Sequence, residues 1–288
     1  MTKRSNHQKP YWLDKKVNLS VCRQIKQKMR GFKLHTVCEE SLCPNISECF
    51  MRDTATFMIL GNICTRNCAF CSVNKGKPLG IDSDEPKRVA TAVKDMGLKY
   101  VVITSPTRDD LSDGGAAIFA ETVREIKKIS DNIKVELLVP DFQGNKEAID
   151  KVVLSGCDVL GHNLETAAAL YPFVRKGADY DRSLNLLNYI KERDSGILTK
   201  SSIMLGLGET VEEIQLLMND LRTVKCDLFA AGQYLSPSIY TYKVKEYIVP
   251  ETFDAIEKYA YEIGFLASKC APYVRSSYLA DSFISSKK

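Results

Sequence analysis

Residues 55–73 read Ala-Thr-Phe-Met-Ile-Leu-Gly-Asn-Ile-Cys-Thr-Arg-Asn-Cys-Ala-Phe-Cys-Ser-Val, an apolar run that leads directly into three closely spaced cysteines. Three residues separate Cys64 from Cys68, and two separate Cys68 from Cys71. This spacing lets one short loop turn three thiolates toward a common centre, as iron–sulfur ligation requires. No fourth cysteine follows closely, so one iron of a four-iron cluster would stay open to an outside ligand. An open metal position is typical of catalysis rather than of structural support.

The Cys64–Cys71 loop has two competing interpretations. A structural zinc site normally has four protein ligands arranged in pairs, and a chance group of buried thiols needs no metal at all. The loop, with aromatic Phe70 before its last cysteine, resembles the cluster loop of radical S-adenosylmethionine enzymes. The resemblance implies that the methionyl amine and carboxylate chelate the open iron. It also implies that an electron from the cluster cleaves the sulfonium and releases a 5′-deoxyadenosyl radical, which takes hydrogen from unactivated carbon.

A second group of three cysteines, Cys38, Cys43 and Cys49, lies upstream. Four residues separate the first pair and five separate the second, and again no fourth cysteine is close. An iron–sulfur cluster with a fourth ligand other than cysteine fits this arrangement. The remaining cysteines lack ligand spacing, and we interpret them as small packing residues. They are Cys22, Cys157, Cys226 and Cys270.

The segments around both triads are similar to lipoyl synthases. They read HTVCEE at 35–40, CPNI at 43–46 and ATFMILG at 55–61. In that family the upstream triad holds an auxiliary four-iron cluster whose sulfides become the two sulfur atoms of the product. The serine before the tyrosine of an Arg-Ser-Ser-Tyr tail is the fourth protein ligand of that cluster. Here the tail is Arg275-Ser276-Ser277-Tyr278, so the resemblance, which runs from about Lys9 to Tyr278, implies that Ser277 is this ligand.

Composition narrows the class of protein. The chain has 288 residues, of which 44% are hydrophobic and 26% charged, as in one large α/β domain or two small ones. No apolar run approaches the roughly 20 residues of a membrane helix, and no signal-peptide core follows the N-terminus. Ten cysteines without a secretory signal indicate metal ligation rather than disulfides. We therefore expect a cytoplasmic protein without a membrane partner.

Net charge is +4, too small to imply a nucleic-acid partner. The charge is uneven, because residues 1–30 hold nine Lys or Arg against Asp14 alone. This stretch is either a solvated arm or a docking surface for an acidic protein.

From residue 55 onward, short β-branched runs alternate with helical patterns. Predicted strands cover 56–60, 100–104, 134–139, 159–163, 201–205 and 228–234. Predicted helices cover 19–32, 85–96, 115–129, 146–154, 183–191, 209–224 and 250–267. Six β/α steps imply a parallel sheet with right-handed crossovers. Six strands are too few for a closed barrel, so we expect a partial (β/α)6 TIM-type barrel whose lateral mouth admits a substrate attached to a protein.

The expected organisation has three parts. Residues 1–50 form an N-terminal extension with the auxiliary-cluster cysteines, 51–267 form the partial barrel, and 268–288 form the C-terminal tail.

Polar residues gather where the strands end, which is where parallel α/β folds place their chemistry. The loop after the second strand is either an ordinary capped turn or, as the resemblance implies, part of the S-adenosylmethionine site through Thr104, Ser105, Arg108 and Asp109. After the fourth strand, Asn163 and Glu165 could bond ribose hydroxyls or the methionyl amine. After the fifth, Gly206, Gly208 and Glu209 form either a tight turn or a backbone approach to the ligand.

The end of the sixth strand is expected to face the substrate. Gln233 is placed at the mouth of the barrel. The following segment, 236–242, lacks the basic and histidine residues usual in lipoyl synthases, which leaves its contact with a carrier protein open.

The expected activity is radical insertion of two sulfur atoms, at the sixth and eighth carbons of an octanoyl chain on a lipoyl carrier domain. The carrier would be a 2-oxoacid dehydrogenase E2 or a glycine cleavage H protein. The cofactors would be two 4Fe-4S clusters and S-adenosylmethionine, two molecules per lipoyl group. Further expected partners are an electron donor such as ferredoxin or flavodoxin, and a cluster-repair protein.

Two alternatives stay open. One is a biotin-synthase-like sulfur inserter acting on a free small molecule, although the upstream triad and the tail motif argue against it. The other is a non-catalytic iron–sulfur electron carrier, which would normally have complete cysteine sets.

Overall fold

The computed structural model describes residues 9–15, 18–41, 43, 45–51 and 55–285. Lys3, Arg4 and Lys16 of the basic N-terminal stretch lie outside this part of the chain, as do Leu42 and Pro44 beside the upstream cysteines.

One sheet dominates the described residues, with the strand order β1-β2-β5-β6-β7-β8-β9-β10. The first strand, β1, is antiparallel to β2, and every other neighbouring pair is parallel. The edge strands β1 and β10 do not pair with each other, so the barrel is open, as predicted. The strands are β1 (His35–Thr36), β2 (Ala55–Met58), β5 (Tyr100–Thr104), β6 (Lys134–Leu138), β7 (Val159–Gly161), β8 (Leu198–Leu205), β9 (Leu228–Gln233) and β10 (Ala267–Cys270). A small separate sheet pairs β3 (Ile63–Cys64) with β4 (Asn74–Lys75).

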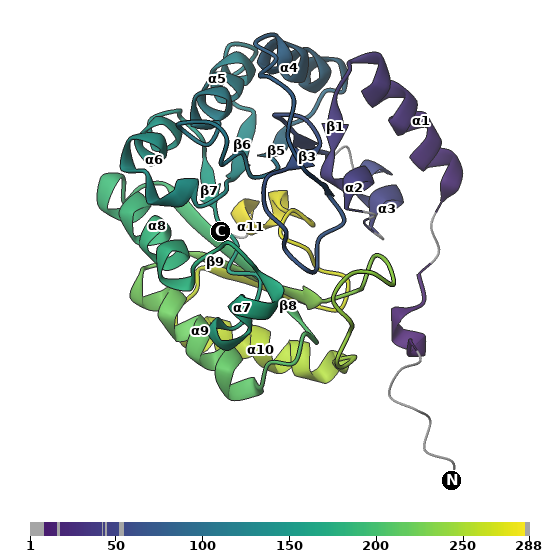
Figure 1. Ribbon diagram of the computed structural model, residues 1–288, viewed down its shortest axis with the longest axis vertical. Helices are drawn as coiled ribbons and strands as arrows, with labels where there is room; N and C mark the ends of the chain where they lie inside the picture. The colour runs from purple at the N-terminus through teal and green to yellow at the C-terminus, as the bar shows by residue number, and fades with distance from the viewer. Residues whose placement is uncertain (1–8, 16–17, 42, 44, 52–54, 286–288) are drawn as a thin grey trace.

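Helices follow the parallel strands and cover the outside of the sheet (Figure 1). The helices α2, α6, α8 and α9 begin at a residue whose side chain accepts a hydrogen bond from the first turn; Thr210 also forms a reciprocal capping box with Glu213. The α-helices are α1 (Leu19–Gly31), α2 (Val37–Glu40), α3 (Ile46–Met51), α4 (Glu85–Asp95), α5 (Ala116–Lys127), α6 (Lys146–Val153), α7 (Tyr171–Val174), α8 (Tyr180–Arg193), α9 (Val211–Thr223), α10 (Pro250–Glu262) and α11 (Asp281–Ser285). Short 3-10 turns are η1 (Tyr11–Leu13), η2 (Phe142–Gly144) and η3 (Ala168–Leu170).

The prediction of six strands was incomplete, because the parallel part of the sheet also contains β10. The predicted helix 250–267 ends at Glu262, the chain turns at Gly264 with φ 95°, and the strand begins at Ala267. The proposed boundary at residue 268 therefore falls inside a strand, and the boundary at residue 50 falls inside α3.

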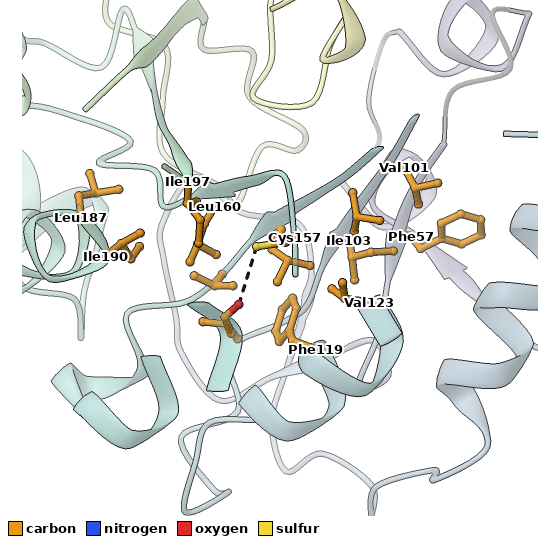
Figure 2. Close-up of a cluster of buried hydrophobic side chains, with 14 of the residues drawn as sticks. Phe57, Val101, Ile103, Phe119, Val123, Cys157, Leu160, Leu187, Ile190 and Ile197 are labelled. Carbon is orange, nitrogen blue, oxygen red and sulfur yellow. Dashed lines mark hydrogen bonds between the residues drawn. The ribbon is translucent and has the colours of Figure 1, made fainter. Parts of the chain in front are cut away.

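The main core lies between the outer face of the sheet and the helices. Figure 2 shows Phe57, Val101 and Ile103 of the strands facing Phe119 and Val123 of α5. The Cys157 thiol lies in the same layer and donates to the Val152 carbonyl at 3.7 Å. All four cysteines predicted to be packing residues are buried, which confirms that interpretation.

Figure 1 shows α11 inside the ring of strands, and its contacts place it at their amino-terminal ends. Phe283 of this helix is 2% exposed and packs against Val159 and Leu228, the first residues of β7 and β9. Beside it lies a buried ion pair in which Lys200 Nζ is 2.9 Å from Glu136 Oε1. Because the tail fills this end, the open carboxyl end of the barrel remains for a substrate. No described helix is long and apolar enough to cross a bilayer.

Candidate active site

The radical loop, residues 61–73, begins where β2 ends. Gly61 turns the chain with φ 83°, a conformation that favours glycine. The backbone N–H and the hydroxyl of Thr65 both donate to the Thr107 carbonyl, at 3.0 and 2.9 Å. Ala69 donates to the Val174 carbonyl at 2.8 Å, and its own carbonyl accepts from Tyr242 at 2.8 Å. The loop is therefore held by the segments that follow β5, β7 and β9.

Arg66, between two of the cysteines, fixes this loop to two neighbouring strand ends. Its side chain is 8% exposed and donates to Asp109 at 2.7 and 2.9 Å and to Asp141 at 2.9 and 2.6 Å. Asp141 is fully buried and also accepts from Arg182 Nε at 2.9 Å. Burial alone would raise the pKa of Asp109 and Asp141, but the hydrogen bonds and charge of Arg66 hold both below their usual range.

The three thiols of the radical loop lie within electrostatic reach of one another. Burial raises the pKa of Cys68 to about 12, and Arg175 opposes the shift, while the charges of Cys71 and Cys64 add to it. Burial likewise raises the pKa of Cys71. In the upstream triad, burial raises the pKa of Cys38 well above its ordinary value, and the charges of Cys43 and Cys49 raise it further. The thiols of each predicted triad therefore interact electrostatically, and their role as cluster ligands stays a prediction.

The donor set of both triads fits iron–sulfur clusters. Within the described residues, no three His, Cys, Asp or Glu side chains are arranged to hold a single metal ion. A four-iron cluster has its thiolates on different iron atoms, so its ligands need not meet at one point. The protons held by the buried thiols would leave when metal binds, because the ligand is the thiolate.

The C-terminal tail returns across the mouth and lies against the upstream triad. The Tyr278 hydroxyl donates to Glu48 at 2.6 Å, one residue before Cys49, and Asn45 donates to the Tyr273 carbonyl at 2.6 Å. Burial lowers the pKa of Arg275, and the charge of Cys43 opposes this, so the two side chains interact electrostatically. The expected return of the tail is confirmed by these contacts. Ser277 is half-buried between Ser276 and Tyr278; its role as a ligand stays a prediction.

Gly232 of β9 permits this close return. A Cβ at this position would lie 1.9 Å from the Val274 carbonyl oxygen, so only glycine leaves room for the tail backbone.

One predicted S-adenosylmethionine contact, Ser105, lies open to a ligand. The Ser105 hydroxyl is buried and has no hydrogen-bond partner in the part of the chain that the structure describes. Such a group favours a polar ligand, because an unsatisfied buried hydroxyl is costly. Thr104, beside it, instead donates to the Leu138 carbonyl at 2.7 Å.

Asn163 connects the tail with Glu165. Its amide donates to Glu165 Oε1 at 3.0 Å, and its carbonyl oxygen accepts from the Ser276 hydroxyl at 3.0 Å. Glu165 has φ 66°, which is uncommon for a residue with a side chain. Its backbone bonds to Ser202 and Met204 of β8 hold that conformation.

The other predicted contacts are engaged within the protein. Arg108 is 2% exposed and donates to Asp110 and to the Leu60 and Leu79 carbonyls. Glu209 accepts from the Gly206 and Leu207 N–H groups at 2.5 and 2.9 Å. These side chains brace their loops, and direct ligand contact by them, by Asp109 and by Gly208 stays a prediction.

The packing of neighbouring backbone explains why residue 206 is a glycine. A Cβ there would lie 2.2 Å from the Glu246 carbonyl oxygen, so the glycine is required by neighbouring backbone. This supports the tight-turn interpretation at that position.

Sequence reasoning missed Arg66, Asp141 and Arg175. Asp141 follows β6 directly and so occupies the same strand-end position as the predicted residues, a signal that was available. Arg66 stands between two cluster cysteines. Nothing in the sequence near Arg175 indicates that it lies beside Cys68.

Comparison with known proteins agrees with this geometry. The sequence model of the Radical SAM superfamily matches residues 58–221. A curated lipoyl synthase from Caldicellulosiruptor saccharolyticus is 54% identical over 275 residues, which are 95% of this chain and 96% of the relative. Another from Aquifex aeolicus is 54% identical over 257 residues, 89% of this chain and 93% of the relative. The chain belongs to the lipoyl synthase family.

Members of the lipoyl synthase family use S-adenosylmethionine and 4Fe-4S clusters as cofactors. This chain contains enough cysteines for two clusters. Among solved structures, coproporphyrinogen III oxidase (HemN) from Escherichia coli has a TM-score of 0.54 at 14% identity, over 73% of this chain and 53% of that one. This similarity supports the partial-barrel fold of the present chain and concerns the fold alone.

Proposed function

We propose that this chain is a lipoyl synthase that inserts two sulfur atoms, at the sixth and eighth carbons, into an octanoyl chain borne by a lipoyl carrier domain. Nearly full-length identity to curated lipoyl synthases supports this function. The observation that carries it is the return of the tail motif onto the upstream triad, at the same mouth as the radical loop. A sulfur inserter for free small molecules would not need that second site, and an electron carrier would need neither the tail motif nor a lateral mouth.

Each group of residues has a distinct role in this proposal. Cys64, Cys68 and Cys71 hold the reducing cluster, whereas the upstream triad with Ser277 holds the auxiliary one. When bound, the clusters supply an electron for cleavage of S-adenosylmethionine and the sulfur atoms of the product. A serine alkoxide binds iron more weakly than a thiolate, which suits a cluster that is consumed. Upstream triad residues are Cys38, Cys43 and Cys49.

Hydrogen bonds within the protein fix the positions of these two cluster sites. Arg66 fixes the radical loop to the ends of β5 and β6. Asn163 bonds Ser276, the neighbour of Ser277, on one side and Glu165 on the other. We infer that Ser105 and Glu165 contact S-adenosylmethionine. The surrounding loops are supported by Thr104, Arg108, Asp109, Gly206, Gly208 and Glu209.

The proposal extends to partners and location. The carrier is a 2-oxoacid dehydrogenase E2 or a glycine cleavage H protein, the electron donor is a ferredoxin or flavodoxin, and a repair protein rebuilds the auxiliary cluster. The N-terminal extension, the barrel and the tail, near 1–50, 51–267 and 268–288, act together in the cytoplasm.

Anaerobic reconstitution tests the proposal. We expect about eight irons and eight sulfides per chain, as two four-iron clusters require. Incubation with S-adenosylmethionine, a reductant and an octanoylated carrier should convert the octanoyl group to lipoyl, measured by mass spectrometry. A protein that holds only about four irons, or that leaves the carrier unchanged, would contradict it.

Ser277→Ala tests the tail ligand. The variant should still form 5′-deoxyadenosine, because the radical loop is untouched, while sulfur insertion falls by about 10-fold or more, as for loss of a residue that supports a metal. Ser276→Ala is the neighbouring comparison, because it removes the hydrogen bond to Asn163 and leaves Ser277 in place, and so shows what a weaker tail contact alone does. Equal loss of both activities in Ser277→Ala would refute the assignment.

A further inference from the structure

Five exposed lysines surround the mouth of the barrel. All of them lie between the carboxyl end of a barrel strand and the long helix that later packs on the sheet, namely from β2 to α4, from β7 to α8 and from β9 to α10, so we place them on one face of the molecule. None forms an ion pair with the residues that the structure describes. We name them the rim lysines: Lys75, Lys77, Lys176, Lys243 and Lys245.

The carboxylates of the same segments are mostly neutralised internally. Asp109 and Asp141 bind Arg66, Asp110 binds Arg108, Asp113 binds Lys151 and Asp82 binds Arg88. Asp84, Asp179 and Glu246 are exposed without an ion pair among the described residues, so three such carboxylates stand against five rim lysines. The mouth therefore presents a net positive face, although the whole chain carries a charge of only +4.

Large apolar side chains stand among these lysines. Ile239 and Tyr240 are 85% and 92% exposed at the tip of the segment between β9 and α10. Leu79, before α4, is 81% exposed, and Phe173 of α7 is 61% exposed. Exposed apolar side chains on the same face as unpaired charged side chains are typical of a protein interface rather than of a solvated surface.

The segment 234–248 that carries this tip is held firmly. Gln233 donates to the Glu246 carbonyl at 3.0 Å and accepts from Ile248 at 2.8 Å. The Tyr234 hydroxyl donates to the Tyr242 carbonyl at 2.7 Å. Ala69 of the radical loop bonds both Tyr242 and Val174, so this segment and α7 flank the radical loop directly. Figure 1 shows the segment beside that loop at the opening of the barrel.

We propose that the rim lysines, with Ile239 and Tyr240, are the docking surface for the octanoylated carrier domain, and that the carrier face around its modified lysine is acidic. This inference rests on the proposed function. Because the acyl chain is tied to the carrier by one lysine side chain, the carrier must lie against the mouth for the chain to reach the clusters. The unpaired lysines then meet carboxylates, which sets orientation and association rate. Lys243 and Lys245 directly follow the stretch 236–242, which lacks the basic and histidine residues usual in lipoyl synthases, and would take over their role.

The test compares a folded substrate with a small one. Reconstituted wild-type protein and the K243E/K245E variant are assayed with an octanoylated carrier domain and with a short octanoyl-lysine peptide. We expect KM for the carrier to rise by about 10-fold or more at low salt, and its salt dependence to weaken, because rim charges act on association. The kcat for the peptide should change by less than about two-fold.

Two further variants make the test specific. K94E/K99E reverses two exposed lysines at the opposite end of the barrel, in the last turn of α4 and before β5, and should leave both substrates unaffected. I239S/Y240S should raise KM for the carrier without altering the peptide reaction.

The outcomes separate the two proposals. Wild-type protein that modifies both substrates while rim variants match K94E/K99E would overturn the docking surface alone. Wild-type protein that modifies neither substrate would overturn the function and the docking surface together. Rim variants that lose the peptide reaction as much as the carrier reaction would also refute docking, because the defect would then lie in the active site.

Discussion

Replacing Lys200 with methionine should sharply lower the stability of the fold. Lys200 and Glu136 are each 1% exposed, and Lys200 Nζ lies 2.9 and 3.1 Å from the two carboxylate oxygens. The Tyr100 hydroxyl donates to the same carboxylate at 2.6 Å. Without the ammonium, Glu136 would keep a buried charge with one neutral donor. Breaking such a pair from one side costs about 3–5 kcal/mol.

The helix that closes the barrel adds to this loss. Lys200 Nζ lies 4.4 Å from the centroid of the Phe283 ring, a desolvated cation–π contact worth up to about 2 kcal/mol. Since a domain is stable by only about 5–15 kcal/mol, K200M should remove a large share of its stability. The double variant E136Q/K200M should recover most of the loss, because no unpaired charge remains buried.

Urea unfolding of the reconstituted proteins, followed by far-UV circular dichroism, measures these differences. A single variant within about 0.5 kcal/mol of wild type, the range of ordinary surface substitutions, would refute the reasoning. A double variant as unstable as the single one would refute the charge argument and leave only lost packing.

Two further predictions concern buried groups near the site. R66K loses the paired hydrogen bonds to Asp109 and Asp141. Formation of 5′-deoxyadenosine should therefore fall by about 10- to 100-fold, although the variant binds the normal amount of iron. An unchanged rate and an unchanged cluster spectrum with S-adenosylmethionine would contradict this. Burial, and then the charge of Arg175, lower the pKa of His162 to about 3. The unfolded chain binds this proton near pH 6.5, so stability is full above that pH and falls by about 1.4 kcal/mol per unit as pH drops toward 3. H162Q should show a shallower decline in urea unfolding between pH 7 and 5, and an identical slope would exclude the assignment.

Local sequence signals were sufficient to predict six of the parallel strands and the helices that follow them. They depend on short-range periodicity and on ligand spacing, which the chain carries without its tertiary structure. The strand β10 was missed because Ser268 and Lys269 interrupt its apolar pattern, and Lys269 Nζ lies 5.4 Å from the Phe283 ring inside the barrel. That partner is unknowable before the tail is placed.

The candidate site shows the same limit. The loop after β5 was correctly predicted as a polar strand-end loop, but which of its side chains are available to a ligand depends on distant partners. Asp109 is engaged by Arg66, 43 residues earlier in the chain, whereas Ser105 is left without a partner among the described residues. Only the folded structure shows which of these side chains are engaged within the protein and which remain available to a ligand.

The tail that carries Ser277 also carries Phe283, so the same few residues complete both the hydrophobic interior and the proposed auxiliary site. During synthesis these residues leave the ribosome after all the strands of the barrel. Maturation of this protein is therefore ordered in time: the barrel cannot be sealed, and the serine cannot reach the upstream thiols, until the whole barrel has been synthesised.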